Sequence, residues 1–161
     1  MSLIHRRRRI SLITPVFVAN NFIKRGRAEN VGITPLKLQK LVYFLYREYL
    51  KRTSEPLFSE RFETWKFGPV VPSIYAEFSS YGSKEIKSYA TDSKGKCFAV
   101  TEVGIFKESI DKVWGIYGRH SGETLSDLTH QNGTAWSKAK EKQQKYLAID
   151  DIRNEEELYV G

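Results

Sequence analysis

The chain has 161 residues, of which 40% are hydrophobic and 28% charged, a composition typical of one folded domain with a single core. Without an apolar run of about 18 to 20 residues or the pattern of a secretory signal, we expect no membrane contact. The only cysteine, Cys97, excludes an intrachain disulfide and a cysteine-based zinc cluster, so we expect a cytoplasmic protein.

The net charge of +7 comes from the first third of the chain. Residues 1–52 contain 12 Lys or Arg and 2 Asp or Glu, whereas residues 53–161 contain 14 and 17. Such asymmetry is typical either of an anionic partner or of a solvated basic tail. A run of arginines can neutralise nucleic-acid phosphates. The alternative nucleic-acid contacts are therefore Arg6, Arg7, Arg8 and Arg9.

Two Thr-Pro pairs predict the first two helices. In Thr14-Pro15 and in Thr34-Pro35, a hydroxyl that can cap a helix precedes a proline, whose missing N–H costs nothing in the first turn. We expect the first helix to run to about Arg25 and to end at Gly26. The second helix should cover about residues 35–52.

The second helix is apolar on most of its sides, which predicts a position at the centre of the core. Its polar side is a line of Lys37, Lys40, Arg47 and Lys51, with Phe44 among them. We expect this line to face solvent. Two interpretations stay open, because the line is either the hydrated side of the helix or a contact for an acidic partner.

The remaining elements are predicted to be short. Residues 57–67 should be irregular or briefly extended before a turn at Gly68-Pro69, and Phe98 with Val100 should form a short strand. Further helices are expected over about 72–82, 101–117 and 134–145, and a short one from Ser121 or Thr124 to His130. The predicted fold class is mainly α: a single compact helical domain of about six helices with at most a minor β element. Its expected limits are a basic extension at 1–13, the helical domain at 14–149 and an acidic tail at 150–161.

The sequence contains no assembled catalytic motif. Ser126 and His130 would share one side of a helix, with Asp127 beside them, but no nucleophile elbow or oxyanion loop accompanies them. Glu63 and Lys66 would point to opposite faces of a strand and cannot share a metal site. Gly-rich phosphate loops are absent. We therefore predict no enzymatic activity, no catalytic residue, no metal and no cofactor.

The segment Trp65-Lys66-Phe67 has two interpretations. Its aromatic rings are either core residues beside a rigid turn or the anchors of a surface for a protein partner. If the segment is extended, both rings share one face, and we expect them to pack inward with Lys66 facing out. Trp136 has the same two interpretations.

Three blocks in fixed order carry a family resemblance: residues 33–44 (ITPLKLQKLVYF), 65–75 (WKFGPVVPSIY) and 125–130 (LSDLTH) with Trp136 shortly after. Together they resemble the SocA-like antitoxin domain, or Panacea domain, a family related to phage-associated proteins. The likeness extends from about Val16 to about Lys140. It implies a small bacterial or phage protein that binds a toxin protein and silences it.

This resemblance implies an antitoxin that neutralises a cognate toxin by direct protein–protein binding. The alternative is a phage-associated regulator that binds nucleic acid through its basic arm, although the second helix is too apolar to lie in a groove of DNA. The candidate partner-binding residues are Lys37, Lys40, Phe44, Arg47, Lys51, Trp65, Lys66, Phe67, His130 and Trp136.

Overall fold

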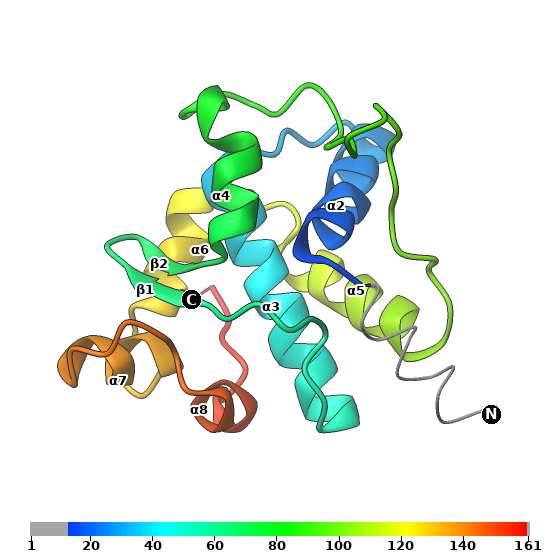
Figure 1. Cartoon of the computed structure of the whole chain (residues 1–161). Helices are drawn as coiled ribbons and strands as arrows, with labels where there is room; N and C mark the ends of the chain where they lie inside the picture. Colours follow the sequence, from blue (N-terminus) through cyan, green and yellow to red (C-terminus); the bar gives the residue numbers. More distant parts are fainter. Residues whose placement is uncertain (1–12, 161) are drawn as a thin grey trace.

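In the computed structural model, helix α3 (Pro35–Thr53) passes through the middle of the molecule and the other elements surround it (Figure 1). The structure describes residues 13–160. The other helices are α2 (Pro15–Glu29), α4 (Pro72–Phe78), the 3-10 helix η1 (Ser79–Tyr81), α5 (Gly104–Tyr117), α6 (Gly122–Thr129), α7 (Ala135–Glu141) and α8 (Ile149–Asn154). Two short strands, β1 (Glu63–Trp65) and β2 (Gly68–Val70), form an antiparallel pair.

The mainly α fold class is confirmed, and so are the predicted starts of the first two helices. The Oγ1 atoms of Thr14 and Thr34 accept hydrogen bonds from the N–H groups of Phe17 and Lys37, each over 3.3 Å, and a proline follows each cap. Within residues 13–160, no helix is long and apolar enough to cross a membrane.

The end of the first helix was predicted wrongly. Helix α2 continues past Gly26 to Glu29, and Asn30 ends it in the left-handed conformation. Gly26 instead permits close packing, because a Cβ atom there would lie 2.7 Å from the carbonyl oxygen of Val31. The small residue is needed for this contact and does not stop the helix.

The predicted strand at Phe98 and Val100 does not form, because buried asparagine side chains from α2 occupy the backbone groups of this segment. The Asn20 amide nitrogen donates to the carbonyl oxygens of Ala90 and Phe98, at 3.0 and 2.8 Å. Asn21 donates to the Val100 carbonyl and accepts from its N–H, both over 2.8 Å. These side chains make the backbone hydrogen bonds that a partner strand would otherwise make.

The predicted exposure of the basic line on α3 is also wrong. Lys37, Lys40, Phe44 and Arg47 are all buried, and only Lys51 of this group is exposed. The Phe44 ring stacks on that of Tyr117 of α5, with 4.1 Å between the ring centres. The elements around α3 cover nearly all of its sides, and later elements bring backbone carbonyls and one carboxylate to the buried cations of this line. The surrounding sequence could not reveal these acceptors.

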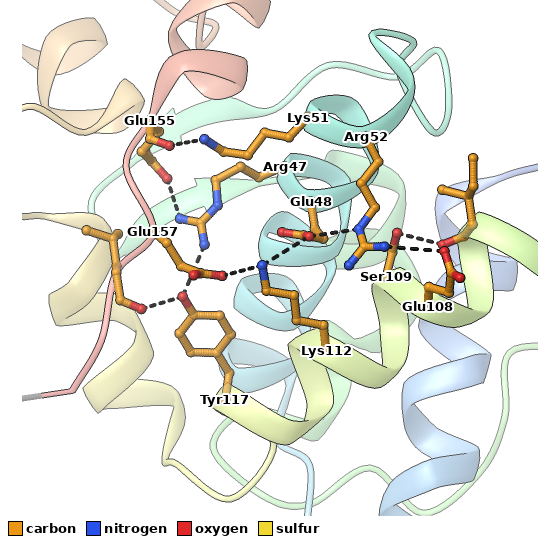
Figure 2. A network of polar contacts seen from close by, with 12 residues as sticks. Arg47, Glu48, Lys51, Arg52, Glu108, Ser109, Lys112, Tyr117, Glu155 and Glu157 are labelled. Atoms are coloured by element: carbon orange, nitrogen blue, oxygen red, sulfur yellow. Dashed lines mark hydrogen bonds and ion pairs between the residues drawn. The ribbon is translucent and has the colours of Figure 1, made fainter.

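Arg47 and Glu155 form a buried ion pair between α3 and the C-terminal segment (Figure 2). Arg47 Nη1 lies 2.8 Å from Glu155 Oε2, and each side chain is 2% exposed. The other carboxylate oxygen accepts from the Tyr43 hydroxyl and from the N–H of Ala135, both at 2.9 Å. Ala135 begins α7, so this carboxylate also lies at the positive end of a helix.

A second layer of charges surrounds this pair closer to solvent. Lys112 of α5 lies between Glu48 of α3 and Glu157, at 3.2 and 3.0 Å from their carboxylates (Figure 2). The hydroxyl of Tyr117 donates to the Leu158 carbonyl. The segment that we expected as an acidic tail, 150–161, therefore packs on α3 and α5 over its described part, through Glu155 and the buried Ile152.

The substitution Glu155→Gln should lower the free energy of unfolding by about 3 to 5 kcal/mol, because it leaves the Arg47 guanidinium buried without its counter-charge. Urea denaturation at neutral pH measures the change. Glu156→Gln, at the exposed next residue, is the matched control and should change stability by less than about 0.5 kcal/mol. Similar effects of the two variants would contradict a structural role for the pair.

Candidate functional site

The two strands form a hairpin, residues 63–70, whose two-residue turn is Lys66-Phe67. In the register of the pair, Trp65 lies opposite Gly68. The outer edge of β1 is also paired, because the N–H of Thr64 donates to the Lys145 carbonyl over 2.8 Å. The hairpin is thus held within the fold on both sides, and its turn projects from it (Figure 1).

The backbone of the hairpin turn is held by side chains from α6, from α7 and from His130, which follows α6. Three consecutive carbonyl oxygens of the hairpin each accept a hydrogen bond. The donors are Trp136 Nε1 to Trp65 at 2.8 Å, His130 Nε2 to Lys66 at 3.1 Å, and Ser126 Oγ to Phe67 at 2.6 Å. The bond from His130 requires the proton on Nε2. The rings of His130 and Trp136 also pack edge to face, with centres 4.0 Å apart.

Helix α3 holds the second strand of the hairpin in the same way. Lys40 Nζ donates to the Pro69 carbonyl over 2.9 Å, and the Gln39 amide both accepts from the N–H of Val71 and donates to its carbonyl. Gly68, with φ of +112°, makes this approach possible: a Cβ atom there would lie 2.8 Å from Cε of Lys40. The three sequence blocks therefore meet at one hairpin.

This arrangement displays aromatic rings on the surface. Phe67 is 59% exposed and Tyr75 of α4 is 50% exposed, while Lys66 is exposed between the strands. The half-buried Trp65 ring packs edge to face with Tyr75, at 4.7 Å between centres. The expectation that both rings pack inward is wrong for Phe67, because Ser126 and His130 bind the backbone of the turn and leave the Phe67 ring outside. The Trp65 ring is half-buried.

The candidate residues divide into two groups in the structure. Trp65, Lys66, Phe67, His130 and Trp136 come together at the hairpin, with Lys40 beneath it. The other candidates on α3 lie elsewhere: Lys37 donates to the Gly118 carbonyl, while Phe44, Arg47 and Lys51 belong to the region around Glu155. Arg6 to Arg9 lie outside the described residues, so nucleic-acid contact there stays a prediction.

Three residues of the site were not predicted as part of it: Gln39, Tyr75 and Ser126. Each lies inside one of the three blocks that carry the family resemblance, which was the available signal. Ser126 and His130 do not bond to each other, because each is used by a carbonyl of the hairpin. Among residues 13–160, no group of three or more His, Cys, Asp or Glu side chains is placed to hold a metal ion.

Lys40 has an unusual electrostatic environment. Its side chain is fully buried, and this burial lowers the pKa of its amine from 10.5 to about 7. Burial also lowers the pKa of Lys37, to which the positive charge of Arg119 contributes. Arg47 differs: burial alone would lower the pKa of its guanidinium, but the Glu155 carboxylate raises it. The Lys40 amine beneath the hairpin therefore has the carbonyl oxygen of Pro69, and no carboxylate, as its acceptor.

Comparison with known proteins gives two matches. The family model described as "Antitoxin SocA-like, Panacea domain" matches residues 38–137. A protein named antitoxin SocA, from Caulobacter vibrioides, is 35% identical over 124 residues, which cover 74% of this chain. The match spans 66% of that relative, slightly less than two thirds of its length. No solved structure matches the chain.

The substitution Lys40→Met should flatten the rise of stability with pH. Because the unfolded chain binds a proton at Lys40 up to pH 10.5 and the folded chain only to about 7, the wild-type protein gains stability as pH rises through this window. The lysine should contribute about 2 kcal/mol of this gain between about pH 7 and about pH 9. Urea denaturation across this range measures it.

In the same experiment Lys66→Met removes an exposed lysine of the hairpin and controls for the loss of one cation. Equal pH slopes for wild type and Lys40→Met would contradict the assignment of the low pKa to Lys40.

Proposed function

The chain belongs to the SocA-like antitoxin family defined by the Panacea domain, and from this premise we propose that it is an antitoxin that neutralises a cognate toxin by binding it directly. The binding surface in this proposal is the displayed side of the hairpin, with Trp65, Phe67 and Tyr75 as anchors and Lys66 between them. The carrying observation is that all three blocks of the family resemblance are used to build and present this hairpin.

The exposed aromatic side chains of this surface are suited to binding a protein. Exposed aromatic side chains have a large contact area and few rotatable bonds, so they lose little conformational entropy when a partner binds. The hydrogen bonds from Ser126, His130 and Trp136 fix the turn before binding and reduce that cost further. A pre-formed aromatic turn is what a tight protein contact requires.

The proposed activity needs neither a catalytic step nor a cofactor. The side chains that could have served a hydrolase, Ser126 and His130, hold the backbone of the turn. A reducing compartment such as the cytoplasm suits the free and exposed Cys97. In this proposal the protein acts by occupying a surface of the toxin.

The double substitution Phe67→Ala and Tyr75→Ala should abolish neutralisation without unfolding the protein. Truncation of a central aromatic anchor costs about 2 kcal/mol or more, which corresponds to about thirtyfold in affinity for each residue. The measurement is growth of cells that express the toxic product of the gene adjacent to this one, together with either form of the antitoxin. Size-exclusion chromatography of the purified pair then reports the complex, and circular dichroism reports the fold.

Val103→Ala is the matched control, because Val103 is another exposed apolar residue and directly precedes α5. Helix α5 lies on the other side of α3 from the hairpin (Figure 1). The control variant should rescue growth fully. Rescue by the double variant would remove the hairpin from the binding surface. Failure of the wild-type protein to protect cells against any adjacent gene product would contradict the antitoxin role itself.

A further inference from the structure

A groove of about 430 Å³ lies between the hairpin turn, the start of α3 and helix α4. Its floor and rim are mainly apolar and aromatic. Its apolar and aromatic lining side chains include Leu36, Trp65, Phe67, Val70, Ile74 and Tyr75. The exposed rings of Phe67 and Tyr75 belong to it, so the groove is continuous with the surface proposed above for the toxin. It can enclose one large apolar side chain.

The charges of this groove have one sign. Lys40 and Lys66 line it, and no carboxylate does. None of the ion pairs formed within residues 13–160 includes either lysine. On the same helix, Arg47 is equally buried but has Glu155 as its counter-charge. The groove thus combines an apolar lining with positive charge that lacks an internal partner.

We propose that this groove binds a segment of the toxin in which an aromatic or large aliphatic side chain is flanked by a carboxylate; this inference rests on the proposed function. The apolar side chain fills the space between the rings of Phe67 and Tyr75 and the floor at Leu36 and Ile74. The carboxylate pairs with Lys66, which is exposed at the turn. In its protonated form, Lys40 adds positive potential from beneath the floor, where the low dielectric strengthens it.

The groove fits a protein segment better than a nucleic acid. The Trp65 and Tyr75 rings are inclined at 62° to each other, and their edge-to-face contact gives no parallel platform on which successive bases could stack. Lys66 is the one exposed cation among the lining residues, whereas a path for a phosphate backbone needs several. An apolar anchor beside one or two carboxylates matches both the shape and the charge.

The test uses three capped pentapeptides, Gly-Asp-Trp-Asp-Gly, Gly-Asn-Trp-Asn-Gly and Gly-Lys-Trp-Lys-Gly, titrated into the full-length protein labelled with ¹⁵N and ¹³C. Amide resonances of residues 65–75 should shift with the acidic peptide, and its Kd should be about fivefold lower than that of the neutral peptide. The basic peptide should bind more weakly than the neutral one. Binding of the acidic peptide should also raise the pKa of Lys40, followed through its ¹³Cε resonance.

Two variants and one control sharpen the test. Phe67→Ala should remove the shifts for all three peptides, and Lys66→Glu should reverse the preference between the acidic and basic peptides. Lys94→Glu makes the same change of charge at an exposed position between η1 and α5 and should preserve the order. Equal affinity for the acidic and basic peptides, or shifts confined to other regions, would overturn the proposal. So would tighter binding of a single-stranded tetranucleotide, or concentration-dependent shifts of 65–75 without peptide, which would indicate a second copy of the chain.

The outcome for this groove is separate from the outcome for the antitoxin role. If the adjacent gene product does not bind the wild-type protein, the proposed function fails, and the peptide series still decides what the groove binds. If the gene product binds through the hairpin but the acidic peptide has no advantage, the antitoxin role stands and this inference fails.

Discussion

The burial of α3 on nearly all sides is the constraint on which the rest of this structure depends. A helix at the centre of a small domain must lose water around its whole circumference, and α3 carries cations as well as apolar side chains. Buried cations are costly unless other groups replace the lost water. The elements around α3 are therefore arranged so that acceptors point toward its basic side chains.

The structure meets this requirement in two ways, with different consequences. Arg47 obtains a carboxylate from Glu155, which fastens the C-terminal segment and the start of α7 to the core. Lys37 and Lys40 obtain backbone carbonyls of Gly118 and Pro69 instead. A carbonyl compensates a cation only partly, so Lys40 has a lowered pKa and no carboxylate partner beneath the hairpin. The ion pair of Arg47, in the second half of α3, thus stabilises the fold. Lys40, in the first half, supports the surface of the hairpin.

Hydrogen bonds from the core to the hairpin backbone also explain why the hairpin can display aromatic rings. Its backbone oxygens are satisfied from below by Ser126, His130, Trp136 and Lys40, so the turn is rigid without burying its own side chains. The rings of Phe67 and Tyr75 are then free for a partner. In the proposed antitoxin function, the core and the binding surface are coupled through these few bonds.

The sequence by itself determined the helical fold class, the helix starts at Thr14 and Thr34, and the family, because caps, prolines and short motifs act over a few neighbouring residues. It also led to Trp65, Lys66, Phe67, His130 and Trp136 as candidate residues, in one list with the basic line of the second helix, and only the structure separated the two groups. Only the tertiary structure decided which side chains are buried. The line of Lys37, Lys40 and Arg47 has the spacing of a hydrated face, and its burial depends on carbonyls and a carboxylate that are at least 29 residues away in the chain. The outward direction of the Phe67 ring likewise depends on donors from α6 and α7, which no local pattern around the hairpin could supply.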